Sequence, residues 1–269
     1  MTADSNSQFR AQFGEDRLLD DYFEHKRAGF FVEIGAYNGV DFSNTYYFEQ
    51  NGWRGLLVEP DAEEAANCRA SRPRSRVIEC AAVGPESVGE VTFQVVPGWR
   101  ALSARAVSRR RAGEELVGSL EIEERTVPAR TIDSILQEVE PPEIDFVTID
   151  VEGGEWDVLR GFSLPTWKPQ VVIIERAEAL PDRRILDYMH RHRYAYLRTT
   201  GSINDWFVRL APEAALWTPL YTLKFWLSLY LPGIFLDRVA FPVKRAIKKV
   251  LALIGLEGPV RRLLGRPKP

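Results

Sequence analysis

Apolar residues gather in five short, nearly continuous runs within the first two thirds of the chain, and polar stretches separate most of them. The runs occupy residues 30–36, 55–60, 75–84, 144–152 and 170–176. Runs rich in β-branched residues and bounded by turn residues are typical of strands buried on both faces of a parallel sheet. Since helical stretches alternate with the runs, the pattern predicts a doubly wound α/β fold with right-handed crossovers.

A different pattern follows the fifth run. Residues 180–193 have the pattern of a helix, and two further strand-like runs, AYLRTT and DWFVRLA, are separated by the four residues 201–204. A short connection of this kind between two such runs favours an antiparallel hairpin. We therefore expect residues 1–212 to form one domain, with a mostly parallel sheet that ends in a C-terminal hairpin.

The charge of the chain is divided unevenly along its length. Residues 213–269 contain ten lysines and arginines and three acidic residues, so this tail carries +7. The chain as a whole carries −3, which leaves −10 for residues 1–212. An asymmetry of this kind indicates a partner for the tail, and the acidic body disfavours a nucleic-acid partner, because phosphate binding requires positive charge.

The tail combines an apolar, aromatic-rich segment at 216–236 with a basic amphipathic helix at 241–256. Lys224 lies near the middle of the first segment, and Pro219 and Pro232 interrupt it, so the segment is expected to lie on an anionic membrane surface and not to span the membrane. The alternative is that the tail packs on the body or forms an oligomer contact. The oligomeric state is left open.

Composition narrows the class of protein further. The chain is 45% hydrophobic and 27% charged, which is typical of a folded globular protein. Its two cysteines, Cys68 and Cys80, lack the spacing of a disulfide framework or a zinc site. The N-terminus lacks the apolar core of a signal peptide, so we expect a cytoplasmic protein. If the tail binds a membrane surface, the protein would be peripheral at the inner face of the membrane.

Two acidic residues and two glycines follow the ends of the first two predicted strands. They are Glu33, Gly35, Gly39 and Glu59. Ligands of such sheets bind outside the carboxyl ends of the strands. There, glycines allow the backbone to approach the ligand closely, and an acidic side chain accepts hydrogen bonds from the hydroxyls of a ribose. The stretch therefore predicts a nucleoside pocket. Its spacing differs from G-x-G-x-x-G, which disfavours a nicotinamide-dependent oxidoreductase.

Four acidic residues gather at the ends of the fourth and fifth predicted strands. Asp150, Glu152 and Glu155 lie within six residues, and Glu175 ends the neighbouring strand. Glu152 and Glu155 could simply complement a helix dipole, for about 0.3 to 1 kcal/mol each. The full set requires an offsetting proton or cation. It predicts either a general base that accepts a hydroxyl proton, with Asp150 as first choice, or a Mg²⁺ site.

Several segments between residues 11 and 176 resemble, in the same order along the chain, the FkbM family of S-adenosylmethionine-dependent methyltransferases. The similar segments are AQFGEDRLL, VEIGAYNGVDFSNTYYFEQNGWRGLLVEPD, CAAVG, RTIDSIL, IDFVTIDVEGGEWDVLRGF and VVIIE. The resemblance implies a class I methyltransferase (Rossmann-like) fold, S-adenosylmethionine as cofactor and a hydroxyl acceptor, commonly on a sugar or polyketide. It does not extend to residues 213–269.

The resemblance also implies roles for individual residues. The implied cofactor-binding residues are Glu33, Gly35, Ala36, Asn38, Gly39, Glu59, Pro60, Asp61, Ala81 and Asp150. The expected catalytic residues are Asp150, Glu152 and Glu175, which would also be the ligands if a metal is held. Asn38 could equally cap a helix.

These observations predict an O-methyltransferase that acts on a hydroxyl of a sugar, a glycan (lipid-linked in one version) or another secondary metabolite. Two alternatives come from other classes. One is a noncatalytic, membrane-associated scaffold on a methyltransferase fold, and the other is a nicotinamide-dependent oxidoreductase.

Overall fold

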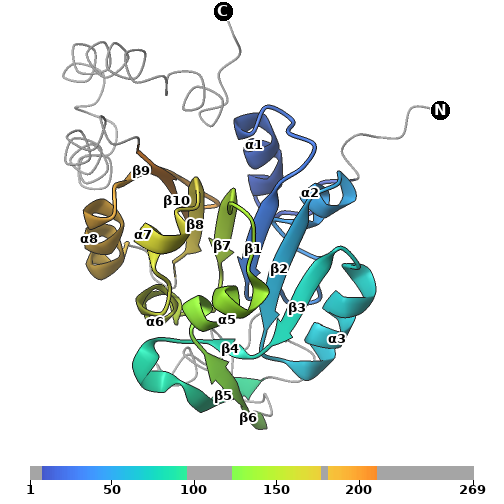
Figure 1. Ribbon diagram of the computed structural model, residues 1–269, viewed down its shortest axis with the longest axis vertical. Coiled ribbons are helices and arrows are strands. Elements are labelled where there is room, and N and C mark those ends of the chain that lie inside the picture. The colour runs from blue at the N-terminus through green and yellow to red at the C-terminus, as the bar shows by residue number, and fades with distance from the viewer. Residues whose placement is uncertain (1–7, 96–122, 177–180, 211–269) are drawn as a thin grey trace, which may run out of the picture.

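Helices and strands alternate along most of the chain in the structure, a computed structural model that describes residues 8–95, 123–176 and 181–210 (Figure 1). The helices are α1 (Glu15–Tyr22), α2 (Tyr46–Gln50), α3 (Ala62–Ser71), the 3-10 turn η1 (Pro85–Ser87), α5 (Ile132–Val139), α6 (Glu155–Arg160), α7 (Leu164–Trp167) and α8 (Arg183–Arg191). The strands are β1 (Phe30–Ile34), β2 (Arg54–Glu59), β3 (Ser75–Glu79), β4 (Ala81–Ala82), β5 (Gly89–Val95), β6 (Glu123–Arg130), β7 (Phe146–Ile149), β8 (Val171–Glu175), β9 (Tyr194–Thr200) and β10 (Asn204–Arg209).

The central sheet has seven strands in the order β3-β2-β1-β7-β8-β10-β9. The five strands predicted from apolar runs all pair in parallel, and β10 pairs antiparallel with both β8 and β9. This confirms the mostly parallel sheet and the C-terminal hairpin. The chain moves outward from β1 to β3 and then returns to β7 on the other side of β1, so the strand order reverses between β1 and β7.

Both faces of this sheet are buried, as continuous apolar strands require. Alternate residues of β1 point to opposite faces. Val32 and Ile34 belong to a core built with residues of α5, α6 and α8, and Phe31 belongs to a second core built with residues of α1, α2 and α3. The helices therefore divide into two layers around the sheet, and the carboxyl ends of the parallel strands stay available at one edge.

A second sheet, β4-β6-β5, was not predicted and corrects the assignment of residues 75–84 to one strand. That run splits into β3 and the short β4, which leaves the central sheet and pairs with β6. The antiparallel pair β5 and β6 is partly exposed and rich in charged residues, so it lacks the continuous apolar run by which the other strands were found. The small sheet lies beside the carboxyl end of β3 (Figure 1).

The N-terminal element AQFGEDRLL links α1 to the hairpin. Glu15 is fully buried and accepts hydrogen bonds from Thr200 Oγ1 and, at 2.8 Å, from Asn204 Nδ2. Asp16, also buried, accepts backbone hydrogen bonds from Arg10 and Ala11. Because Glu15 joins segments almost 190 residues apart, the element holds the first and last described segments together at the carboxyl edge of the sheet.

Within the described residues, no helix combines the length and the apolar character that crossing a membrane requires. The predicted tail at 213–269, with its basic amphipathic helix, lies outside the described residues.

Candidate active site

The candidate site lies where the strand order reverses, at the carboxyl ends of β1 and β7. Gly35 follows β1 with φ of +83°, and a Cβ atom at this position would overlap the backbone carbonyl of Asp150. The backbone N–H of Asp150 donates to Ile34 at 2.9 Å. The two loops are therefore in direct backbone contact, and only glycine allows it.

The loop after β1 turns back on itself and onto β2. The N–H groups of Gly35 and Ala36 both donate to the carbonyl of Val58, and Gly39, with φ of +77°, donates to Ala36. Asn38 Oδ1 accepts hydrogen bonds from the backbone N–H groups two and three residues later, and its Nδ2 donates to Asp41 at 2.8 Å. Asn38 therefore closes a turn within the loop.

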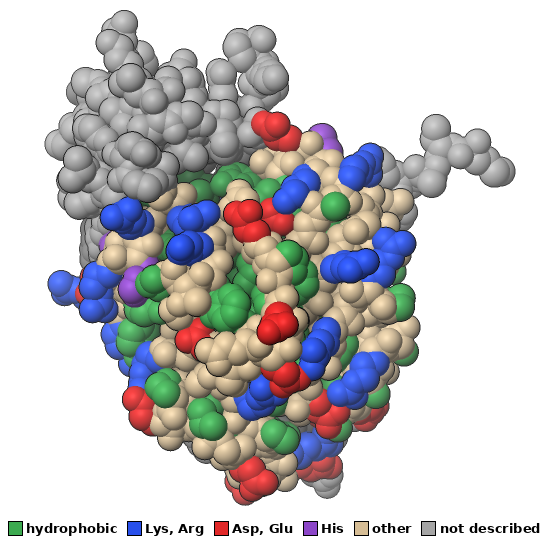
Figure 2. Space-filling view, in the orientation of Figure 1, with side chains coloured by type: hydrophobic (Ala, Val, Ile, Leu, Met, Phe, Trp, Pro, Cys, Tyr) green, Lys and Arg blue, Asp and Glu red, His purple; other side chains and the backbone are tan. Residues whose placement is uncertain are grey.

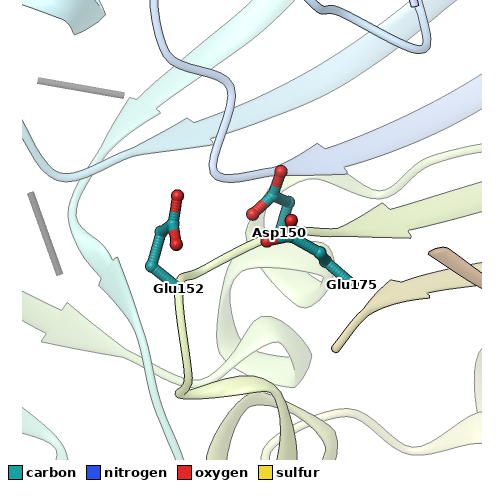
Figure 3. Close-up of side chains that lie close together, drawn as sticks. All are labelled: Asp150, Glu152 and Glu175. Atoms are coloured by element: carbon teal, nitrogen blue, oxygen red, sulfur yellow. The ribbon is translucent and has the colours of Figure 1, made fainter. Parts of the chain in front are cut away.

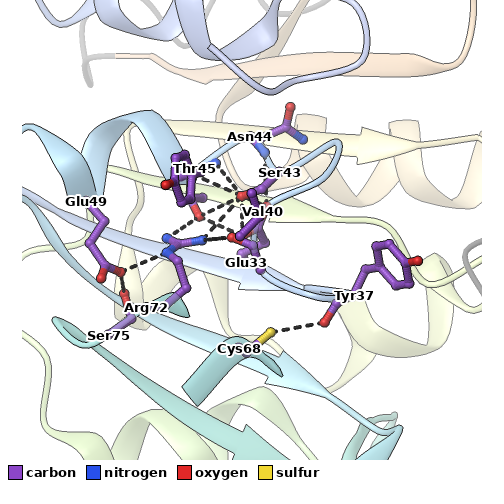
Figure 4. Close-up of polar contacts among 12 residues, drawn as sticks. Glu33, Tyr37, Val40, Ser43, Asn44, Thr45, Glu49, Cys68, Arg72 and Ser75 are labelled. Atoms are coloured by element: carbon purple, nitrogen blue, oxygen red, sulfur yellow. Dashed lines mark hydrogen bonds and ion pairs between the residues drawn. The ribbon is translucent and has the colours of Figure 1, made fainter. Parts of the chain in front are cut away.

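Glu33 is buried beneath this loop and holds its far end (Figure 4). Its carboxylate accepts hydrogen bonds from the hydroxyls of Ser43 and Thr45, at 3.0 and 2.6 Å, and from the backbone N–H of Asn44 at 3.0 Å. Burial raises the pKa of Glu33, and the charge of Arg72 opposes this rise. The geometry therefore gives Glu33 a role in shaping the loop on which the cofactor was predicted to bind.

Glu59 ends β2 and is oriented by two backbone groups. Its Oε2 accepts a hydrogen bond from Tyr37 N at 2.8 Å, and its Oε1 accepts one from Asp61 N at 2.9 Å. A carboxylate has about four lone-pair positions, so acceptor capacity remains for a ribose diol. Glu59 is 7% exposed, and burial raises its pKa to about 7.

The other predicted cofactor residues near Glu59 lie at the same edge. Pro60 follows β2, and Ala81 lies on β4. Asp61 is the N-cap of α3: its Oδ1 accepts hydrogen bonds from Glu63 N and Glu64 N, and its Oδ2 pairs with Arg125 of β6. Asp61 therefore connects the end of β2 to the small sheet.

The three predicted catalytic carboxylates come together, with one oxygen of each within 4.8 Å of the others (Figure 3). Asp150 and Glu152 follow β7, and Glu175 ends the neighbouring β8. Because the carboxyl groups of Asp150 and Glu175 lie this close together, having both ionised is unfavourable unless a proton or a cation offsets their charge. Prediction and structure agree on the convergence of these residues at one edge of the sheet.

The surroundings of Asp150 raise the affinity of its carboxylate for a proton. The side chain reaches solvent but has protein on most sides. This partial desolvation, the hydrogen bond with Glu175 and the negative charges of Glu175, Glu152 and Glu155 raise the pKa of Asp150 well above its ordinary value. A carboxyl group with a raised pKa takes up a proton more readily near neutral pH.

The turn between β7 and α6 has an unusual backbone. Glu152 has φ of +57°, a left-handed conformation that is uncommon for a residue with a side chain, and Gly153 follows with φ of +112°. The buried carboxylate of Glu155 accepts a hydrogen bond from Gly153 N at 2.8 Å. Glu155 therefore stabilises the turn, and the turn holds Glu152 beside Asp150.

Arg72, Ser43 and Thr45 were missed by the sequence analysis. All three are buried and surround Glu33. The polar segment SNT, which begins four residues after Gly39, was the available signal for the hydroxyls.

On the face shown in Figure 2, acidic and basic side chains are interspersed among hydrophobic ones, without one broad basic patch.

Comparison with known proteins gives a family for this site. The model of the methyltransferase FkbM domain matches residues 33–196, more than half of the chain, and this range includes every predicted site residue. Among curated proteins, none matches the chain.

Three solved structures resemble the chain at low identity. A TehB-like SAM-dependent methyltransferase from Corynebacterium glutamicum is 12% identical, with a TM-score of 0.40 over 76% of this chain and 91% of that one. An O-methyltransferase from Bacillus cereus, in complex with SAH, is 13% identical, with a TM-score of 0.36 over 76% and 84%. TrmK from M. capricolum, with S-adenosyl-homocysteine, is 12% identical, with a TM-score of 0.35 over 89% and 97%. Because the family model covers the β1 loop and the acidic cluster together, this chain belongs to the methyltransferase FkbM domain family.

Proposed function

We propose that this protein transfers a methyl group from S-adenosylmethionine to a hydroxyl oxygen of a small-molecule or glycan acceptor, with Asp150 as the general base. The observation that carries this proposal is the position of Asp150. Its backbone contacts Gly35 of the β1 loop, and its carboxyl group contacts Glu175 of β8. One residue therefore links the predicted nucleoside pocket to the cluster of carboxylates.

The residues around the β1 loop fit the nucleoside part of this cofactor. Glu59 lies at the end of β2 with its carboxylate fixed by Tyr37 and Asp61, and its remaining lone pairs suit the two hydroxyl donors of a ribose. The net negative charge of the acidic cluster suits the positively charged sulfur of the cofactor. Glu59 and the loop from Gly35 to Gly39 would therefore hold the cofactor, as the family resemblance implies.

Asp150 performs the proton transfer in this proposal. S-adenosylmethionine, when bound, would supply a methyl carbon on a positively charged sulfur; the acceptor oxygen would bond to that carbon, and the electron pair of the broken carbon–sulfur bond would stay on the sulfur. The carboxylate of Asp150 accepts the hydroxyl proton, and the electrons of the O–H bond stay on the oxygen. Glu175 and Glu152 orient Asp150 and the acceptor hydroxyl.

The charge of the carboxylate cluster could be offset by a proton shared between Asp150 and Glu175, and a divalent cation is the alternative. Asp150, Glu152 and Glu175 present oxygens within 4.8 Å of one another, and carboxylate oxygens are the ligands that Mg²⁺ prefers. These three residues would then hold the ion, and the ion would lower the pKa of the acceptor hydroxyl. The two versions differ in their response to a chelator.

We further propose that the tail holds the protein at a membrane surface. The support is its charge of +7 and its basic amphipathic pattern, since a basic residue near an anionic leaflet contributes about 1 kcal/mol. This placement would suit a lipid-linked glycan as the acceptor. It is independent of the proposed chemistry.

A labelled-methyl assay tests the proposed activity. The full chain is incubated with methyl-radiolabelled S-adenosylmethionine and a panel of hydroxyl acceptors that includes free, nucleotide-linked and lipid-linked sugars. Transfer to oxygen that is lost in Asp150→Asn and kept in Glu143→Gln, which changes an exposed carboxyl group before β7, supports the proposal. Equal transfer by Asp150→Asn would remove Asp150 from the role of base.

A further inference from the structure

Arg72 is the C-cap residue of α3, and its side chain is fully buried, with 0% exposed. A buried guanidinium requires partners for both its charge and its N–H groups. Its Nε donates to Glu49 of α2 at 2.9 Å, and a terminal nitrogen lies 3.6 Å from Glu33 of β1. One positive charge therefore serves two buried carboxylates.

The other N–H groups of Arg72 hold the β1 loop from beneath (Figure 4). One terminal nitrogen donates to the carbonyl of Gly39 at 2.8 Å and to Ser43 Oγ at 3.3 Å. The second donates to Thr45 Oγ1 at 2.8 Å, and the hydroxyl of Thr45 donates in turn to Glu33. Arg72 therefore fixes the loop at three points between Gly39 and Thr45.

The C-terminal end of α3 adds two more contacts to the same loop. Cys68 Sγ donates to the carbonyl of Tyr37 at 3.0 Å, and Ser71 Oγ donates to the carbonyl of Asn38 at 3.2 Å. Tyr37 is the residue whose N–H orients Glu59. The position of the loop on α3 thus determines where the N–H of Tyr37 meets the Glu59 carboxylate.

We propose that Arg72 is a positioning residue for the cofactor: it fixes the loop from Gly35 to Thr45, and through Tyr37 it fixes the carboxylate of Glu59. This inference rests on the proposed function, because its readout is the affinity for a sulfonium nucleoside or its product. Arg72 acts through the loop and does not touch the cofactor. Lysine cannot replace it, since one ammonium group cannot reach Glu49, Gly39 and Thr45 together.

The test compares Arg72→Lys with Lys26→Met in the full chain. Lys26 pairs with the buried Asp145 at 2.6 Å, at the amino edge of the same sheet. Its replacement therefore also removes an ion pair with a buried carboxylate, but at a position away from the loop. Urea unfolding gives the stability of each variant, and calorimetry gives its affinity for S-adenosylhomocysteine at a temperature where both are folded. We expect both variants to lose stability and only Arg72→Lys to lose at least tenfold in affinity.

Two further variants keep the inference falsifiable if Arg72→Lys does not fold. Thr45→Val preserves the shape of the side chain but removes the hydroxyl between Arg72 and Glu33, and we expect a severalfold loss of affinity. In Arg72→Ala, guanidinium chloride at low millimolar concentration should restore part of the affinity, and sodium chloride should not. Wild-type affinity in folded Arg72→Lys or Thr45→Val would overturn the inference. A wild type that does not bind the nucleoside would instead overturn the proposed function.

Discussion

Gly35 and Asp150 meet backbone to backbone, and a Cβ atom on Gly35 would occupy the position of the Asp150 carbonyl. The predicted cofactor loop and the predicted base are therefore positioned by a single contact. Any displacement of the loop is therefore transmitted to Asp150, the residue proposed as the general base.

Gly35→Ala should destabilise the protein more than Gly14→Ala. Both glycines have similar φ values, +83° and +78°, so alanine at either position costs about 1 to 2 kcal/mol for the left-handed conformation. At Gly14 a Cβ atom would meet nothing within 4 Å, and at Gly35 it would overlap Asp150. We expect an additional loss of about 1 to 3 kcal/mol for Gly35→Ala, measured by urea unfolding. Equal losses would show that the close contact is relaxed in solution.

Asp150→Asn should stabilise the folded protein at alkaline pH. The pKa of Asp150 is raised in the folded state, so the folded state binds the proton more tightly than the unfolded state. The contribution of Asp150 to stability therefore falls as pH rises from its unfolded pKa through its folded pKa. Removing the charge should raise the urea midpoint at pH 8 and leave it nearly unchanged at pH 4. A lower midpoint at pH 8 would contradict the crowding of charge at this site.

The central sheet could be predicted from sequence because its parallel strands are buried on both faces, so each one is a nearly continuous apolar run such as VVIIE. Residues 89–95 were missed although Val91, Phe93 and Val95 alternate with polar residues. Alternation over one short run indicates a half-exposed strand, but the partner strand is 123–130, and the sequence does not say which segment pairs with it.

The residues of the site also divide into those that could be predicted from sequence and those that could not. Glu33, Glu59, Asp150 and Glu175 could be predicted because each one lies at, or directly after, the carboxyl end of a buried strand. Arg72 could not, because it follows a helix in the polar stretch SRPRSR and resembles a surface residue. Its burial depends on Glu33 and Glu49, which are brought to it only by the fold.

Chelator treatment separates the proton and metal versions of the carboxylate cluster. In the shared-proton version, Mg²⁺ at millimolar concentration leaves the melting temperature of the wild type unchanged, and EDTA has no effect on methyl transfer. This is the result we expect. A rise in melting temperature with Mg²⁺ that disappears in Glu152→Gln would assign Asp150, Glu152 and Glu175 as metal ligands.

Vesicle flotation tests the tail, which lies outside the described residues. We expect the full chain to float with vesicles that contain anionic lipid at low salt. Replacing four basic residues with glutamine should release it, because about 1 kcal/mol per basic residue is lost. These residues are Lys244, Arg245, Lys248 and Lys249. Vesicles of neutral lipid are the control, and a full chain that stays in the soluble fraction would assign the tail to packing or oligomerisation.

The affinity for S-adenosylhomocysteine should depend on pH through Glu59. The pKa of Glu59 is raised to about 7, and only the ionised carboxylate offers its full set of acceptors to a ribose. Below pH 7 the affinity should therefore fall, by up to about tenfold per pH unit. Calorimetry between pH 5.5 and 8.5 measures this slope. In Glu59→Gln the slope should be absent, and an unchanged slope would assign the titration to another group.

Calorimetric titration of S-adenosylhomocysteine at pH 8 measures whether the carboxyl ends of β1 and β2 bind a nucleoside. We expect saturable binding to the wild type with one site per chain. Glu59→Gln should weaken it by about 1.5 to 3 kcal/mol, the range for hydrogen bonds to a charged group, or about tenfold to a hundredfold. Glu63→Gln, which changes an exposed carboxylate two residues beyond Asp61, is the control and should bind like the wild type. No binding to the folded wild type, or equal affinity in Glu59→Gln, would contradict a nucleoside pocket between β1 and β2.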